Sequence, residues 1–138
     1  MNSYIQTHQF LIQKNIKPSV QRTAVMEFLL NNRIHATVDE IYVALSPDMP
    51  TLSKTTVYNT LDLLVKKGAV QMLSIDEKNA RYDADTSNHG HFFCQSCGKV
   101  SDIFNLNPAL FEIPYHPNFK IKTVEISYTG ICKECKEN

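Results

Sequence analysis

The first part of the chain carries apolar residues at helical spacing in three successive segments. Residues 4–14 are loosely amphipathic, and residues 20–30 place apolar side chains on one stripe. Thr37 and Glu40 have the spacing of a capping box, in which each side chain bonds the other residue's backbone N–H. This box predicts a third helix that runs to about Leu45.

A fourth helix is predicted between Ser53, which can cap its N-terminus, and Gly68, which suits a helix end. Residues 70–75 and 81–82 favour strands because they flank a short polar turn. Successive helices followed by a hairpin are typical of a winged helix-turn-helix domain. Its reading helix would span about residues 53–67.

The pattern changes after this hairpin, where residues 85–88 have the composition of a hinge. The sequence therefore predicts a winged-helix DNA-binding domain over residues 1–84 and a second domain over residues 89–138. In the second domain a short helix is expected after Pro108. Strand patterns occupy residues 89–93, 100–104 and 119–128. The predicted fold class is α+β, with a small C-terminal α/β domain after the winged helix.

Composition limits the classes of protein that need considering. Hydrophobic residues make up 43% of the 138 residues, enough for a packed core. Net charge is zero, with 9 basic and 8 acidic side chains in residues 1–84 and 5 and 6 in residues 85–138, so DNA contact would need a local basic surface. With neither a signal-peptide pattern nor a membrane-spanning apolar run, we expect a cytoplasmic location and no membrane partner.

Four cysteines form two Cys-x-x-Cys pairs, Cys94 with Cys97 and Cys132 with Cys135. Two such pairs supply the four thiolates that a tetrahedral structural zinc ion requires. Two disulfides, unrelated buried thiols and a redox dithiol are the alternatives. Disulfides are disfavoured without a secretion signal, and a redox motif does not usually occur twice. The pattern predicts a structural zinc site that holds the second domain together.

A second set of possible metal ligands consists of histidines and aspartates. His89 and His91 lie two residues apart in a predicted strand, so both side chains point to one face. Imidazoles with carboxylates suit a divalent first-row metal such as iron, manganese or zinc. The nearby candidates are Asp83, Asp102 and, from the loop before the capped helix, His35. On spacing alone, such a histidine pair is more often an ordinary surface or core pair than a metal site.

Taken together, these motifs resemble the ferric-uptake-regulator (Fur) family across nearly the whole chain. The matching segments are residues 17–22 (KPSVQR), 35–42 (HATVDEIY), 55–61 (TTVYNTL), 81–83 (RYD), 89–98 (HGHFFCQSCG) and 132–135 (CKEC). The resemblance implies a homodimeric repressor, with a C-terminal dimerisation domain, that binds palindromic operator DNA when its regulatory site holds metal.

Residue by residue, the resemblance implies a regulatory site for iron or manganese formed by His35, Asp83, His89, His91 and Asp102. Asp102 stands where iron-uptake regulators usually carry Glu, and it favours the peroxide-sensing, PerR-like branch. In that branch, bound iron reacts with peroxide and a ligand histidine is oxidised, with His35 and His89 the candidates. Gly90 departs from the family because many iron-uptake members carry Asp there.

The family match also points to DNA contacts on the fourth helix and at the start of the second. Helix N-terminal amides and Lys54 suit phosphate, whereas Tyr58 and Asn59 can touch bases. The predicted contact residues are Arg22, Ser53, Lys54, Thr55, Thr56, Tyr58 and Asn59.

Other functions fit less well. A zinc hydrolase or thiol oxidoreductase needs an open metal position or a low-pKa thiol, and four thiolates saturate zinc. We therefore expect no enzyme. A metal-binding module that does not contact DNA would leave the winged helix without a role. Within the family, an iron- or zinc-uptake regulator is the alternative to a peroxide sensor.

Overall fold

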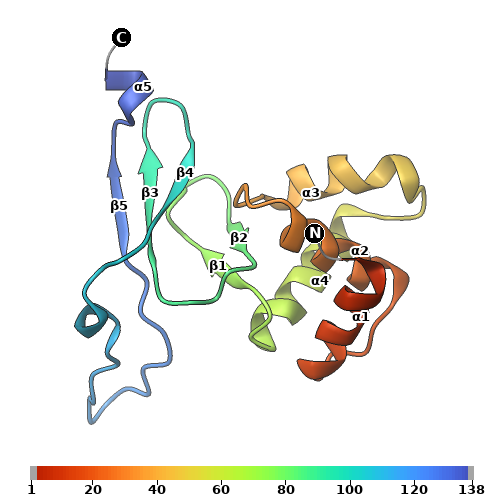
Figure 1. Ribbon diagram of the computed structural model, residues 1–138, viewed down its shortest axis with the longest axis horizontal. Helices are drawn as coiled ribbons and strands as arrows, with labels where there is room; N and C mark the ends of the chain where they lie inside the picture. The colour runs from red at the N-terminus through yellow and green to blue at the C-terminus, as the bar shows by residue number, and fades with distance from the viewer. Residues whose placement is uncertain (1–2, 137–138) are drawn as a thin grey trace. The chain divides into compact units, whose positions relative to one another are not determined.

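The computed structural model describes residues 3–136 and divides into two compact units, Met1–Thr86 and Ser87–Asn138 (Figure 1). Four α-helices and a two-stranded hairpin make up the first unit. The helices are α1 (Tyr4–Gln13), α2 (Val20–Asn31), α3 (Val38–Leu45) and α4 (Lys54–Lys66), with the 3-10 turn η1 (Ser46–Asp48) after α3. The predicted helices are confirmed, with ends within about two residues of expectation.

Each of these α-helices begins after a serine or threonine that caps it. The hydroxyl oxygens accept backbone N–H groups in the first turn, in the pairs Ser3–Gln6, Ser19–Arg22, Thr37–Glu40 and Ser53–Thr56. The predicted capping box at Thr37 is confirmed, since the Glu40 carboxylate accepts the Thr37 N–H at 3.0 Å. At the other end of α4, Gly68 adopts φ +75°, a conformation that favours glycine.

The apolar stripes of the four helices meet in one core. Val25, Ile41 and Leu61 are fully buried there, from α2, α3 and α4. The hairpin closes this core, because Tyr82 of β2 packs against it and is only 4% exposed. Strands β1 (Gln71–Leu73) and β2 (Arg81–Asp83) are antiparallel, as predicted, and an isolated bridge joins Ala36 to Tyr82.

The second unit is a three-stranded sheet in the order β4-β3-β5. The central strand β3 (Gly90–Cys94) is antiparallel to β4 (Val100–Ile103) and parallel to β5 (Ser127–Gly130). A 3-10 turn, η2 (Pro108–Phe111), and a short helix, α5 (Lys133–Lys136), complete it. The helix expected after Pro108 is thus one short turn.

The predicted strand over residues 119–128 is wrong for most of its length. In this region only residues 127–130 form a strand, and they pair with residues 91–94 of β3. Phe119 makes just an isolated bridge with His116 and is 68% exposed. Alternating side chains alone do not make a strand where no edge is available to pair with it.

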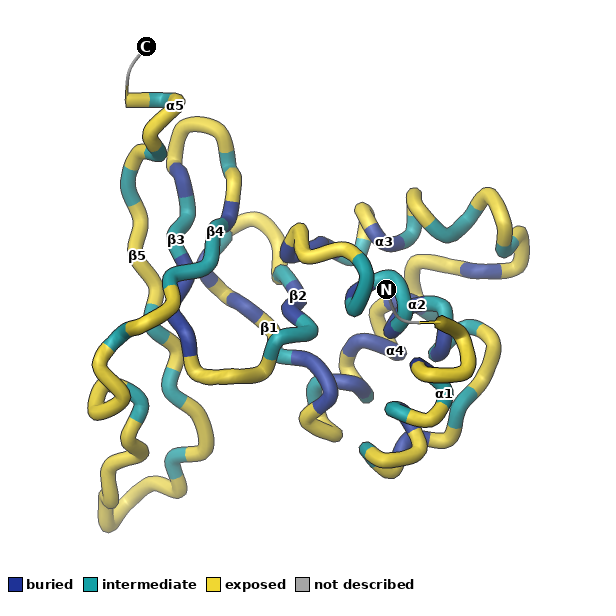
Figure 2. Tube along the Cα trace, in the orientation of Figure 1, coloured by how far each residue is buried: buried dark blue, intermediate teal, exposed yellow. Residues whose placement is uncertain are grey.

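Burial differs sharply between the two units. Within the described part of the second unit, the buried positions all fall between residues 89 and 100, and most of the remainder is exposed (Figure 2). Its buried hydrophobic side chains there are Cys94 and Val100. This unit therefore has little apolar core of its own. Among the described residues, no helix has the length and apolarity to span a bilayer.

Candidate metal centres

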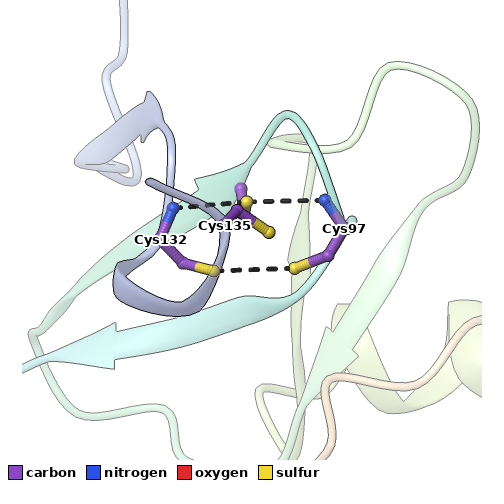
Figure 3. Close-up of side chains that lie close together, drawn as sticks. Cys97, Cys132 and Cys135 are labelled. Carbon is purple, nitrogen blue, oxygen red and sulfur yellow. Dashed lines mark hydrogen bonds between the residues drawn. The ribbon is translucent and has the colours of Figure 1, made fainter. Parts of the chain in front are cut away.

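The four cysteines come together at one end of the second unit's sheet. Cys94 ends β3, and a turn containing Gly98 at φ +77° brings Cys97 back beside it. Because β5 runs parallel to β3, the chain leaves it at the same end and delivers Cys132 and Cys135. Figure 3 shows three of these side chains, with the Cys97 sulfur facing that of Cys132.

The sulfur geometry fits a tetrahedral zinc ion. All four Sγ atoms lie within 4.8 Å of one another, and those of Cys97 and Cys132 are 3.8 Å apart. Zinc–sulfur bonds of about 2.3 Å at tetrahedral angles place sulfurs about 3.8 Å apart. A disulfide would need about 2.05 Å, and all four cysteines are free thiols. The disulfide alternative does not fit this arrangement.

Backbone N–H groups favour the thiolate form that a metal needs. The Cys94 sulfur accepts N–H groups of Cys97 at 3.5 Å and of Cys132 at 3.3 Å. These two hydrogen bonds are the largest causes that lower the pKa of the Cys94 thiol to about 6. Burial and the neighbouring cysteine sulfurs raise the pKa of Cys132 to about 12 and also raise that of Cys135, so those thiols lose their protons only when metal binds. Zinc binds thiolates and displaces their protons, so the Cys94 sulfur is ready for metal at neutral pH.

The second unit also brings three of the predicted regulatory ligands together. His91 of β3 pairs directly with Asp102 of β4, and His89 lies on the same face as His91. The Oδ1 atom of Asp102 lies 3.1 Å from Nε2 of His89 and 3.3 Å from Nε2 of His91. Both imidazoles are almost fully buried. Two ring nitrogens therefore converge on one carboxylate oxygen.

The hydrogen bonds of His89 test whether this group suits a cation. Its Nδ1 lies 2.7 Å from the carbonyl oxygen of Ser87, which can only accept, so Nδ1 carries the proton. In the neutral ring, Nε2 then presents its lone pair to the Asp102 carboxylate. Two acceptors at this distance need a proton or a metal cation between them. A divalent metal bound by both groups meets this need, and its ligand atoms normally lie about this far apart.

The first unit holds the remaining two predicted ligands. Asp83 ends β2, and His35 lies in the loop before α3, where the Ala36–Tyr82 bridge draws the two segments together. Nε2 of His35 lies 3.5 Å from Oδ2 of Asp83, and both side chains are buried. The five predicted regulatory ligands thus form two groups, a pair in the first unit and a trio in the second.

Six of the predicted DNA-contact residues lie at the N-cap and along the first turns of α4, and the seventh, Arg22, lies in the first turn of α2. Tyr58 is 55% exposed and Asn59 is exposed as well. Lys54 has partners within the protein, since its ammonium is 3.2 Å from the Asp39 carboxylate and lies over the Tyr42 ring. Arg22 donates to the Lys17 carbonyl at 2.8 Å. A groove between residues 17–22 and α4 runs along this face.

Comparison with known proteins assigns the family. The model of the ferric uptake regulator family matches residues 13–129, which is most of the chain. The chain belongs to the ferric uptake regulator family.

Within this family, the chain is similar in sequence to peroxide-responsive repressors. A peroxide-responsive repressor PerR from Staphylococcus aureus (strain Mu50 / ATCC 700699) is 37% identical over 131 residues, covering 92% of this chain and 87% of the relative. The solved structure of PerR from Streptococcus pyogenes is 28% identical, with a TM-score of 0.54 and coverage of 98% and 94%. The ferric uptake regulator of Helicobacter pylori has a TM-score of 0.73 at 21% identity, covering 99% and 96%, and shares the fold.

Gly90, which separates the two histidines, is closely packed. A Cβ atom added there would meet Cδ1 of Leu106 at 2.8 Å, so any side chain would displace that leucine. A side chain at position 90 therefore requires the Leu106 side chain to move, since its terminal methyl group is the atom in the way.

Arg81 was assigned no role from the sequence, although it belongs to one of the family motifs. Arg81 lies within the Arg-Tyr-Asp motif and donates to the carbonyl of His35 at 3.3 Å. Its position two residues before Asp83, on the same face of the strand, was the available signal.

Proposed function

We propose that this chain is a homodimeric transcriptional repressor in which a regulatory metal, bound by His35, Asp83, His89, His91 and Asp102, controls binding to palindromic operator DNA. The observation that carries the proposal is the pairing of buried imidazole nitrogens with carboxylate oxygens at 3.1 to 3.5 Å in both units. Each group alone offers too few ligands for an octahedral or five-coordinate site. One cation shared by both groups would couple the two units.

We further propose that iron or manganese fills this site and that the protein senses peroxide. Imidazoles with carboxylates suit both metals, whereas the four thiolates suit zinc. Identity of 37% to a peroxide-responsive repressor and an aspartate at position 102 support this branch. Iron bound here supplies the redox chemistry, with peroxide as the oxidant and the oxygen donor. One oxygen atom of the peroxide would be inserted into a ring C–H bond of His35 or His89 as the O–O bond breaks, and the other oxygen would leave as water. The oxidised histidine would no longer bind metal, and repression would be lost.

The second unit serves dimerisation in this proposal. Its small apolar core leaves large apolar side chains on its surface, among them Tyr115, which is 90% exposed, and Phe119. Burying such side chains against a second copy would remove apolar area from water. A two-fold dimer would also present two α4 helices to the two halves of a palindrome.

DNA would contact the exposed N-terminal half of α4. Helix N-terminal amides suit phosphate, and the polar side chains of Tyr58 and Asn59 are free of the core. Lys54 would exchange its Asp39 partner for a phosphate. We expect a cytoplasmic location, where such DNA is found.

The test uses the zinc-containing protein loaded with Fe²⁺ and exposed to peroxide without other oxidants. Mass spectrometry of the peptides that carry His35 and His89 should show one added oxygen atom, and operator binding should fall in parallel. Protein loaded with redox-inactive Zn²⁺ at the regulatory site is the control and should stay unmodified. Unmodified Fe²⁺-loaded protein that keeps its operator affinity would contradict peroxide sensing and favour an iron- or zinc-uptake regulator.

A further inference from the structure

Two residues of strand β2 contact His35, one at its imidazole ring and one at its backbone carbonyl. Residues two apart on a strand point to one face, so Arg81 and Asp83 both face His35 while Tyr82 enters the core. The Asp83 carboxylate lies 3.5 Å from Nε2 of His35, and Nη1 of Arg81 donates to the His35 carbonyl at 3.3 Å.

Arg81 also holds the turn of the hairpin. Its Nε and Nη2 atoms both lie 3.1 Å from Oδ2 of Asp76, and the other Asp76 oxygen accepts the Lys78 N–H at 2.9 Å. The Arg81 side chain is only 16% exposed, and that of Asp76 only 8%. A shielded, charge-assisted fork of this kind fixes geometry more firmly than a surface ion pair does.

The backbone of His35 needs such support. It adopts φ +52°, a left-handed conformation that is unfavourable for a non-glycine residue. The neighbouring hydrogen bond from Tyr82 N–H to Ala36 O, at 3.0 Å, holds the same loop. Arg81 reaches towards the helix cap too, since Nη1 lies 3.8 Å from Oε1 of Glu40. The His35 loop, the cap of α3 and the hairpin turn therefore share one guanidinium.

We propose that Arg81 is a positioning residue that keeps His35 in the conformation needed for metal binding and links it to the hairpin turn at Asp76. This inference rests on the proposed function, because it takes His35 as a ligand of the regulatory metal. Metal binding fixes His35, His35 fixes Arg81, and Arg81 orders the turn that would lie beside DNA in a winged-helix protein. By reciprocity, ordering of the turn raises metal affinity.

The test compares full-length, zinc-containing variants in two measurements, Mn²⁺ affinity by calorimetry and hydrogen exchange of the amides in residues 74–80 with and without Mn²⁺. Arg81→Met should weaken Mn²⁺ binding about tenfold, as loss of a residue that orients a ligand often does. It should also abolish the Mn²⁺-dependent protection of the turn. Arg81→Lys should keep part of the Mn²⁺ affinity and part of the turn's protection that Arg81→Met loses, because one ammonium group can reach only some of the partners of the guanidinium.

A second variant separates the two contacts of Arg81. Asp76→Asn leaves the Arg81–His35 hydrogen bond in place, so Mn²⁺ affinity should fall less than in Arg81→Met, losing only the contribution of the ordered turn, while the turn loses its Mn²⁺-dependent protection. Arg33→Met removes an exposed arginine that lies 4.0 Å from Asp85, and as the matched control it should change neither measurement.

The outcomes distinguish the inference from the proposed function. Wild-type Mn²⁺ affinity in Arg81→Met, or a turn in the wild type that does not respond to Mn²⁺, overturns the inference alone. Failure of the wild type to bind Mn²⁺ overturns both. If Arg81→Met does not fold, as its zinc content and melting curve would reveal, Asp76→Asn decides: retained protection of its turn overturns the inference, and lost protection supports it.

Discussion

The first unit is stabilised mainly by a buried apolar core, whereas the second unit depends much more on its four cysteine ligands for stability. Cys94 and Val100 are its buried hydrophobic side chains among the described residues, whereas the first unit buries apolar residues from all four helices. A unit of this size rarely supplies enough apolar burial to fold without a metal or a partner. The free energy of zinc binding, about 10–16 kcal/mol for structural sites in small domains, is comparable to the stability of a whole domain.

Replacement of one cysteine tests this dependence on zinc. Cys97→Ser should lose zinc and the dimer, because three thiolates and a hydroxyl bind the ion far less tightly and the unit has little core to replace it. Metal analysis and sedimentation would measure zinc and mass per particle. Gln95→Ala, an exposed change in the same turn, is the control and should keep both. A folded, zinc-containing Cys97→Ser dimer would rule out the proposed structural role.

The sequence predicted the metal-binding side chains better than it predicted the residues that hold them in position. Cysteine and histidine patterns predicted the quartet and the His89–His91 face because spacing alone fixes which side chains share a turn or a strand face. The role of Arg81 could not be read in this way, since its contact with His35 joins residues far apart in the chain. Contacts of that kind depend on tertiary packing, which no local pattern encodes.

Among the elements, the helices of the first unit were predictable because each carries its own start signal. Ser19, Thr37 and Ser53 stand directly before an apolar repeat, and capping is a local interaction. The strand predicted over residues 119–128 has no comparable local signal in the sequence. A strand exists only where a partner edge is available, and here that edge pairs with four residues.

The cap of α4 should matter for DNA binding as well as for stability. Ser53→Ala removes the hydroxyl that accepts the Thr56 N–H at 3.0 Å, which should cost about 1 kcal/mol and fray the first turn of the reading helix. Thermal unfolding and operator binding by fluorescence anisotropy would measure the two effects. Ser3→Ala removes the equivalent cap from α1, so it should lower stability similarly but leave operator affinity unchanged. Equal operator affinity in both variants would argue against DNA contact by the N-terminus of α4.

For the whole molecule, the proposed regulation depends on two metals with separate tasks. The zinc ligands all belong to the second unit, so zinc can stabilise that unit without reference to the first. The proposed regulatory ligands are divided between the units, and a metal that bound both groups would restrict how the units can be arranged. Only differential affinity for the DNA-competent arrangement is required, and each 1.4 kcal/mol of it changes the population ratio about tenfold.

Removal of one proposed regulatory imidazole should therefore impair control by the regulatory metal without affecting stabilisation by zinc. His91→Ala takes away a nitrogen that lies 3.3 Å from the Asp102 carboxylate but leaves every cysteine in place. We expect one zinc per chain and an intact dimer, with Mn²⁺-dependent operator binding weakened by about tenfold or more. His8→Ala, a change on α1 away from the predicted ligands, should behave like the wild type. If His91→Ala still binds operator in response to Mn²⁺, the regulatory site does not include this histidine; if it loses zinc as well, the two metals are not independent.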